Sequence, residues 1–336
     1  MPSTPTATPS PHRAAAGGEP ALARWLLIAA ALGIIMLLIV VPVVNVFYNA
    51  IAPGVEDYWR AQTPEIGSRL GAVGQGFGSY WNSLFTDSDT RHAIFLTLIV
   101  APTAVLLNLV FGLAAAWAIT RFQFPGRTLL TSFIDLPFAV SPVVAGLALV
   151  LIFGLQGYLG PGLRDHGIKI IFAMPGLIMA TTFVTLPFVA RELIPLMESL
   201  GSEEETAAVS LGANGWQIFW RVTLPNIKWG VLYGVILCNA RAMGEFGAVY
   251  VVSGHIAGET DTMPLRVEKL FQEYNDPGSF AVASVLTLLA LATLIAKTAL
   301  EHVTRRQTLI AKHAAERRMG QQASSSPVEP TRRRVP

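Results

Sequence analysis

The residues that could carry chemistry in this chain are charges placed inside an apolar run. In Cys238–Ala248, CNARAMGEFGA, Arg241 and Glu245 are one helical turn apart and Asn239 is close by. This i,i+4 spacing lets the two charges neutralise each other. A charge inside a membrane costs roughly 2.5–3.5 kcal/mol, so such residues normally face a cavity or a partner. Two interpretations stay open: an internal ion pair that fixes helix packing, or the lining of an anion pathway.

A second apolar run, Leu129–Phe153, also contains polar residues and prolines. Membrane helices tolerate such residues where protein or a water-filled path satisfies the backbone. Hydroxyl and amide groups elsewhere in the apolar runs are expected to form interhelical hydrogen bonds rather than ligand contacts. The predicted pathway or gate residues are Asp135, Ser141, Asn239, Arg241, Glu245 and Phe246.

Composition indicates a membrane protein with several spans. The 336 residues are 52% hydrophobic and only 14% charged, whereas soluble proteins average about 25% charged residues. Cys238 is the only cysteine, which excludes a disulfide framework and a thiolate metal cluster. The chain has no phosphate-binding G-x-x-x-x-G-K-[ST] motif, no metalloprotease or hydrolase motif, and no His or carboxylate cluster with metal-ligand spacing. We therefore expect no cofactor on this chain, and energy supplied by a partner.

The elements that position these residues are six predicted spans in an all-α membrane fold. The loop between the second and third spans carries Arg121 and Arg127 without an acid, which is typical of the cytoplasmic side. An even number of spans then places both termini in the cytoplasm. The predicted spans are Trp25–Phe47, Ala93–Ile119, Leu129–Phe153, Ile170–Ala190, Trp229–Val252 and Ser279–Leu300.

Two tails flank this membrane domain. Residues 1–24 are rich in Pro, Ser, Thr and Ala and are predicted to be a disordered cytoplasmic tail. The transmembrane domain covers residues 25–302, with a core at about 92–300, and residues 303–336 form a basic tail. Positive-inside anchoring explains that tail better than nucleic-acid binding does. A signal peptide is the alternative for the first span, but its apolar run is too long. Residues 49–92 and 253–277 are predicted to be external.

The polar stretch Ser202–Ile227 interrupts the apolar runs between the fourth and fifth spans. Ser202 followed by Glu205 predicts a capping box at the start of a short helix. That helix is expected to run to about Leu211, where Gly212 supplies a left-handed stop. A turn at Asn214-Gly215 and a second short helix, ending near Pro225, should follow. On geometry alone, an ordinary capped loop and a docking element are equally good interpretations.

The spacing of this stretch resembles the EAA loop of ABC importer permeases, whose pattern is E-A-A-x3-G-x9-I-x-L-P. Here Thr206 replaces the motif glutamate and Val222 replaces the isoleucine, which leaves open whether Glu205 makes the polar contact. In that family, the loop docks into a cleft on the ATPase subunit. The resemblance implies an ATPase-coupling loop that contains Glu205, Thr206, Ala207, Ala208, Gly212, Leu224 and Pro225.

Two longer strings narrow the resemblance. DLPFAVSPVVAG at Asp135–Gly146 and NARAMGEFGAVYVVSGHIAGET at Asn239–Thr260 are similar to the CysW-type permease subunits of bacterial sulfate/thiosulfate ABC importers. The similarity covers about 92–300. It implies a type I ABC importer (MetI-like) permease fold in the inner membrane, in contact with lipid and with no nucleic-acid partner. The implied assembly has a homologous second permease, a dimeric ABC ATPase that binds ATP and Mg, and a periplasmic sulfate/thiosulfate-binding protein.

Two alternatives to this function stay open. The GEFGA core is also found in molybdate permeases, so a molybdate/tungstate ABC permease is the alternative within the same class. An ion-driven secondary anion transporter, working without an ATPase, is the alternative from a different class. A substrate-competition assay separates the first alternative, and transport that survives loss of the ATPase would support the second.

Overall fold

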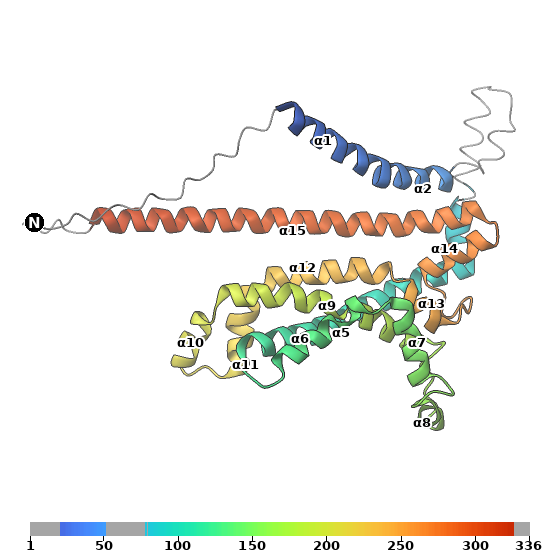
Figure 1. Ribbon diagram of the computed structural model, residues 1–336, viewed down its shortest axis with the longest axis horizontal. Coiled ribbons are helices and arrows are strands. Elements are labelled where there is room, and N and C mark those ends of the chain that lie inside the picture. Colours follow the sequence, from blue (N-terminus) through green and yellow to red (C-terminus); the bar gives the residue numbers. More distant parts are fainter. Residues whose placement is uncertain (1–20, 52–77, 79, 326–336) are drawn as a thin grey trace, which may run out of the picture.

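The computed structural model describes residues 21–51, 78 and 80–325, with side chains from residue 24 to residue 302 of these ranges. All of the regular elements in the described residues are helices (Figure 1). In chain order they are α1 (Ala21–Ile35), the π-helical turn η1 (Met36–Val40), α2 (Val41–Ile51), α5 (Ser88–Arg121), α6 (Arg127–Ala139), α7 (Pro142–Phe153), α8 (Gly160–Asp165), α9 (Met174–Leu200), α10 (Glu203–Ser210), α11 (Gly215–Ile218), the π-helical turn η2 (Phe219–Thr223), α12 (Leu224–Met243), α13 (Gly247–Ser253), α14 (Met263–Gln272) and α15 (Asp276–Ser325). The all-α prediction is confirmed.

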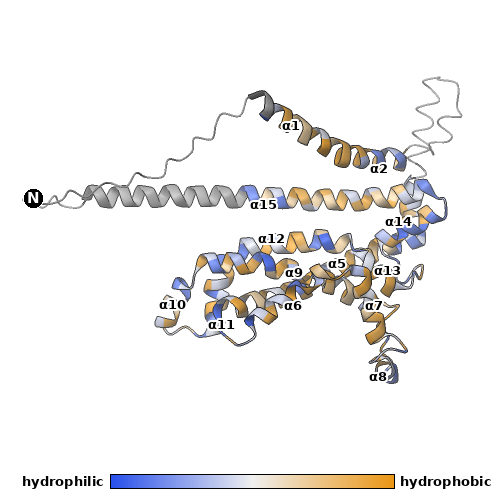
Figure 2. Cartoon of the chain, in the orientation of Figure 1, coloured by the Kyte–Doolittle hydropathy of each residue, from blue (hydrophilic) through white to orange (hydrophobic). Residues whose placement is uncertain are grey.

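Four helical segments are long and apolar enough to cross a membrane: 24–51, α5, α9 and 276–302. Two further helix pairs reach that apolar length only when they are taken together, α6 with α7 and the 215–243 helix with α13. Counting each pair as one span gives the predicted six. Apolar residues dominate the long helices, while polar residues gather on α8, α10 and α14 (Figure 2).

The third and fifth predicted spans each consist of two helices joined at a break. The chain bends by 109° between α6 and α7, and by 54° between α12 and α13. At the first break Ser141 is extended and Pro142 starts the new helix, because proline lacks the N–H that would continue the helical hydrogen-bond ladder. At the second break Gly244 ends α12. Both breaks lie beside predicted pathway residues.

The core is formed where α9 packs between α5 and α12. Gly112 of α5 allows a close approach, since a Cβ there would lie 2.8 Å from the Val189 Cβ of α9. The Asn108 amide donates a 2.7 Å hydrogen bond to the Thr185 hydroxyl across the same interface. Small residues and polar cross-links of this kind replace the hydrophobic effect as the packing force between membrane helices. The expectation of interhelical hydrogen bonds is confirmed at these two residues.

The bundle has two polar ends. α10 and α11 lie at one end, and α13 and α14 lie at the other, with α15 running alongside (Figure 1). The Thr97 hydroxyl accepts the Met263 N–H at 2.8 Å, which fastens α14 to α5. α15 continues to Ser325, well past the predicted end of the sixth span. The predicted tail residues 1–20 and 326–336, and the external residues 52–77, lie outside the described residues.

Candidate functional site

The predicted coupling loop consists of two short helices around a glycine bend. α10 has no buried residue, and Gly212 has a φ of +84°, as the left-handed stop requires. α11 starts with a reciprocal cap: the Gln217 N–H donates to Asn214 Oδ1 at 2.9 Å, and the Asn214 N–H donates to Gln217 Oε1 at 3.0 Å. The left-handed glycine and the reciprocal cap form the bend with local contacts.

The predicted capping box at Ser202 is wrong, because Glu205 is used elsewhere. The Ser202 side chain caps no N–H of α10. The Glu205 carboxylate forms an ion pair with Arg121 Nε at 2.7 Å and accepts a 2.7 Å hydrogen bond from the Thr223 hydroxyl. Arg121 also donates to the Met197 carbonyl at 3.2 Å. We call Arg121, Glu205, Thr223 and the Met197 carbonyl the loop anchor.

The loop anchor joins four elements that are far apart in sequence. Arg121 ends α5, Met197 is in the last turn of α9, Glu205 is in α10 and Thr223 ends η2. The two ionic side chains are only 13% and 15% exposed, so the pair is largely shielded from solvent. The loop anchor therefore links α10 by direct contacts to α5, α9 and η2.

The other predicted loop residues divide between this anchor and an outward face. The Thr206 hydroxyl donates to the Ser202 carbonyl of its own helix at 2.8 Å. Val209, Leu211 and Trp216 are 59%, 89% and 71% exposed, an unusual number of apolar side chains for a polar loop. Sequence reasoning missed these three. Ala207 and Gly212 are exposed beside them.

The predicted end of the second short helix near Pro225 is also wrong. α11 continues through η2 into α12 without a break. Pro225 falls inside this continuous helix, just after the π-helical turn η2, so one hydrogen bond of the helical ladder is missing there. Leu224 packs against the core cluster of Met197 and Ile227. The Leu-Pro pair therefore lies within a helix and does not end one.

The Arg241–Glu245 ion pair predicted from the i,i+4 spacing is confirmed. The Arg241 Nη1 and the Glu245 Oε2 are 2.6 Å apart, and the Glu245 side chain is 1% exposed. The other carboxylate oxygen accepts the Ala248 N–H at 3.0 Å, across the α12–α13 break. Arg241 remains 35% exposed, so a positive group faces outward from a buried acid.

Asp135 pairs with Arg191, a residue that sequence reasoning missed. The Arg191 Nε donates to Asp135 Oδ1 at 2.7 Å, joining α9 to α6. The arginine side chain is 58% exposed and lies over the Phe138 ring, 4.9 Å from its centroid. The predicted fourth span ends at Ala190 and the predicted loop begins at Ser202, so Arg191 belongs to neither. The signal was present in the apolar residues of α9 that continue to Leu200.

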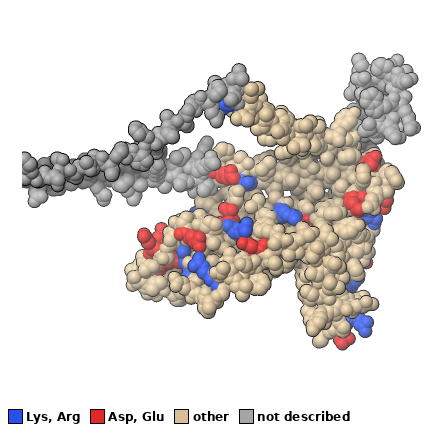
Figure 3. All heavy atoms as spheres, in the orientation of Figure 1, with Lys and Arg blue, Asp and Glu red and all other residues tan. Residues whose placement is uncertain are grey.

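The remaining predicted pathway residues do not join these pairs. Ser141 lies at the α6–α7 break. Asn239 lines a separate apolar cavity of about 530 Å³ between α5, α12 and α15, with its amide 3.8 Å from the Met243 sulfur. The Phe246 ring contacts Tyr250 at 5.2 Å. On the face seen in Figure 3, acidic and basic side chains adjoin in small groups separated by uncharged surface.

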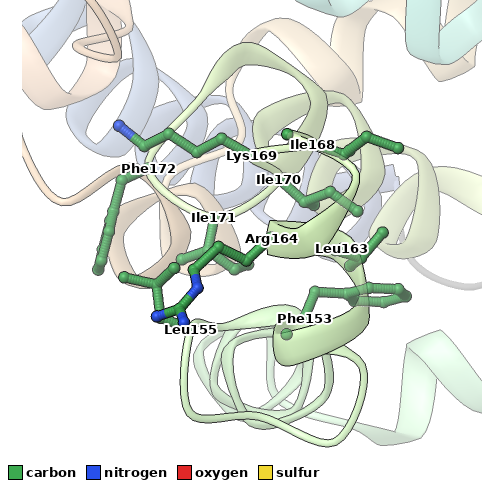
Figure 4. A pocket seen from close by; sticks show the side chains of 11 residues that line it. Phe153, Leu155, Leu163, Arg164, Ile168, Lys169, Ile170, Ile171 and Phe172 are labelled. Carbon is green, nitrogen blue, oxygen red and sulfur yellow. The ribbon is translucent and has the colours of Figure 1, made fainter.

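A further pocket lies at the α7–α8 end and contains none of the predicted site residues. Its volume is about 290 Å³, and apart from Arg164 and Lys169 its lining is apolar or glycine (Figure 4). Figure 4 shows Phe153 and Leu163 side by side at one edge, with Arg164 reaching toward Leu155. Among the described residues, no group of three His, Cys, Asp or Glu side chains could hold a metal ion. The presence of a pocket therefore does not by itself identify the functional site.

Comparison with known proteins gives concordant results. Residues 108–308 match the family of binding-protein-dependent transport system inner membrane components. The chain is 50% identical to the sulfate transport system permease protein CysW of Synechocystis sp., over 84% of this chain and 94% of that protein. It is 40% identical to the sulfate transport system permease protein CysT of Escherichia coli K12, over 67% and 81%. A bacterial alginate ABC transporter solved with its pentasaccharide-bound periplasmic protein has the same fold at 18% identity, with a TM-score of 0.61 over 85% of this chain and 96% of that one.

Proposed function

This chain belongs to the family of binding-protein-dependent transport system inner membrane components, and we propose that it is the permease subunit of an ATP-driven sulfate importer. The relatives at 50% and 40% identity are both permeases of sulfate transport systems. Those names favour sulfate over molybdate or tungstate, and a binding-protein-dependent importer over an ion-driven carrier. Thiosulfate, a tetrahedral dianion of the same charge, is the second substrate we propose.

The proposed assembly follows from the two kinds of relative. Because the chain resembles both CysW and the CysT type, a CysT-type protein is the proposed second permease. The subunit itself is a transport permease and not an enzyme. A separate dimeric ATPase would bind ATP and Mg, and a periplasmic binding protein would deliver the anion. We place the assembly in the bacterial cytoplasmic membrane, with the α10 end and both termini in the cytoplasm.

The observation that supports the coupling role is the difference between the two faces of the α10 loop. Its outer face presents Val209, Leu211 and Trp216 to solvent, while its inner face is fixed by the loop anchor. An exposed apolar patch on a fixed element suits docking to another protein. Closure of the ATPases would move α10, and the anchor would pass that movement to α5, α9 and α12. Nucleotide would thereby bias a two-state rearrangement of the spans.

The substrate path is proposed to follow the ion pairs that face out of the helix bundle. Arg241 is the proposed contact for the anion at the α12–α13 break, with Glu245 holding it in place. Phe246 and Ser141 lie at the two helix breaks, where irregular backbone is tolerated beside a water-filled path. Asn239 faces a different, apolar cavity between α5, α12 and α15.

ATP hydrolysis by the reconstituted assembly tests this function. Binding protein is supplied loaded with sulfate, loaded with molybdate, or empty. The account predicts that the sulfate-loaded protein stimulates hydrolysis and that the other two do not. Equal stimulation by the molybdate-loaded binding protein would mean that the importer does not select sulfate over molybdate. An unchanged rate in all three arms, with a folded complex, would remove the coupling role.

Gly212→Asp tests the loop in particular. The substitution places a side chain at a φ of +84° and adds charge to the docking face. Sulfate uptake should be abolished while the protein remains inserted and assembled with its partner permease. Gly215→Ala, three residues further along the chain and with open space around an added Cβ, is the matched control. Normal uptake by the Gly212→Asp variant would refute the coupling role.

A further inference from the structure

A polar stripe follows one face of α6 through the proposed membrane region. Thr128, Thr131, Ser132 and Asp135 repeat at helical spacing and line a groove of about 390 Å³ between α6 and α9. The side chains of Thr128 and Ser132 are exposed. The Thr131 and Ser132 hydroxyls donate to carbonyls of their own helix at 3.1 and 3.0 Å, but the partly exposed Asp135 carboxylate among them is unfavourable against lipid. The groove therefore faces water or another protein.

An arginine–carboxylate pair stands at each end of this groove. Arg127 and Glu198 are 3.1 Å apart at the end next to the α10 loop. Arg191 and Asp135 are 2.7 Å apart deeper in the bundle. Both pairs link α6 to α9, and the hydroxyl groups lie between them. A positive group is thus available at the start and at the end of a polar track.

Arg191 is presented in a way that suits temporary binding of an anion. Asp135 accepts from its Nε, and among the described residues its two terminal nitrogens have no hydrogen-bond partner. The guanidinium lies over Phe138, whose ring is itself in edge contact with Phe188 at 5.3 Å. A planar guanidinium supported on an aromatic face can offer two parallel donors to an oxyanion.

The depth of Arg191 differs from that of Arg241. The loop anchor sets a common level, because Met197 of α9 and Thr223 before α12 meet there. Counted from that level along their helices, Arg191 is roughly 9 Å deep and Arg241 roughly 27 Å deep. Arg191 therefore lies at a depth between that of Arg241 and the α10 end.

We propose that Arg191 is the anion-binding residue of the inner half of the sulfate path, with Asp135 as its resting counter-ion. The inference rests on the proposed function and deepens it. An arriving dianion displaces Asp135 from the guanidinium, moves along the hydroxyl groups of α6 and leaves past Arg127. Asp135 then returns to Arg191, which keeps the site weak enough to release its anion.

Arg191→Cys in the full reconstituted assembly tests this proposal. The variant should lower sulfate transport by about tenfold, the loss expected for one charge-assisted contact. Stimulation of ATP hydrolysis by sulfate-loaded binding protein should persist. Reaction with aminoethyl methanethiosulfonate, which places an ammonium group at residue 191, should restore transport. The sulfonatoethyl reagent should not.

The controls separate the path from packing and from background. The wild-type chain reports any reaction of the buried Cys238. Leu136→Cys, the next residue after Asp135 and 43% exposed on another face of α6, should show no change in transport with either reagent. Arg191→Lys keeps the cation and should retain more transport than Arg191→Cys.

Two outcomes would overturn the role of Arg191. One is normal transport by the cysteine variant. The other is equal rescue by the two reagents, which would mean that residue 191 fills space and binds no anion. These two outcomes concern the variants alone. The proposed function itself would be wrong if the wild-type assembly failed to respond to sulfate-loaded binding protein.

Discussion

Two arginine–carboxylate pairs of the same length lie in opposite surroundings. Arg121–Glu205 and Arg191–Asp135 are both 2.7 Å apart. The first arginine is 13% exposed and the second 58%. Arg121 also donates a hydrogen bond to the Met197 carbonyl, and Glu205 accepts one from the Thr223 hydroxyl. Arg191 contacts only one carboxylate and one aromatic ring among the described residues. The role of a pair therefore follows from its surroundings and not from the distance between its charged atoms.

The difference in surroundings assigns different work to the two pairs. Breaking a shielded pair leaves a charge without a partner in a poorly solvated place, which is strongly destabilising. Such a pair suits the transmission of movement. An outward-facing pair exchanges partners at little cost, since water or an anion can replace the carboxylate. The loop anchor is thus proposed to transmit movement, and the Arg191–Asp135 pair to handle the anion.

The largest expected effect is that of Glu205→Ala, which removes the centre of the loop anchor. Arg121 loses its counter-ion and Thr223 its acceptor, at a cost of about 1–3 kcal/mol for the unpaired groups. Transport and stimulated ATP hydrolysis should both fall by about tenfold or more, the ratio that this energy represents. Both rates are measured on the same proteoliposomes.

Glu203→Ala is the matched control for that variant. Glu203 is in the first turn of the same helix and is exposed. Surface substitutions of this kind usually change stability by about 0.5 kcal/mol or less. If Glu203→Ala were as damaging as Glu205→Ala, the loss would come from charge on α10 and not from the loop anchor.

Asp135→Asn is expected to have an intermediate effect, on transport but not on stimulated ATP hydrolysis. It leaves Arg191 without its counter-ion, so the anion should be held longer at the groove. Transport should fall by about threefold to tenfold, the range for one weakened charge-assisted bond. Stimulated ATP hydrolysis should stay near the wild-type rate.

The matched control for Asp135→Asn is Glu198→Gln, which loosens the exposed pair at the other end of the groove. A smaller loss of transport is expected there, because Arg127 lies at the exit. Faster transport by Asp135→Asn than by the wild-type chain would contradict the counter-ion role.

The smallest expected effect concerns a third pair, at the α14 end. Arg266 and Asp87 are 2.7 Å apart, and Asp87 is the N-cap of α5. Partial burial acts to raise the pKa of Asp87. Hydrogen bonds from Thr90, Arg266 and the Asp89 N–H, with the arginine charge, outweigh it, so the pKa lies below the ordinary value of 3.8.

A lowered folded-state pKa gives the sign of the pH dependence. The stabilisation by Asp87 is fully present above the ordinary value of 3.8 and is lost as the pH falls through the lowered pKa. Asp87→Asn should therefore lower the unfolding temperature by a constant few degrees from pH 5 to pH 8, and by less as the pH falls below about 4. Asp165→Asn, on the exposed helix α8, should change nothing across that range.

Much of the fold could be predicted from the sequence because span length and loop charge are local properties. The polar loop, its glycine bend and the Arg241–Glu245 pair are also encoded within a few residues, and all are confirmed. The breaks at Ser141 and Gly244 were marked by Pro142 and by glycine. Their angles depend on which helices pack on either side, and periodicity carries no such information.

The candidate site was predicted less completely, since its decisive contacts join distant segments. The sequence predicts that Glu205 forms a capping box with Ser202. In the structure it contacts Arg121 and Thr223 instead, 84 and 18 residues away in the chain. Arg191 could not be matched to Asp135 without the α6–α9 packing. Asn239 was grouped with Arg241 by proximity in sequence, although helical rotation turns it toward another cavity.

The most direct test measures sulfate accumulation and ATP hydrolysis together in proteoliposomes that carry Glu205→Ala or Arg191→Cys. The account predicts that Glu205→Ala loses both activities, and that Arg191→Cys loses transport while its ATP hydrolysis still responds to sulfate-loaded binding protein. If the two variants lost the two activities in the same proportion, the division of labour between the shielded and the exposed pair would be wrong.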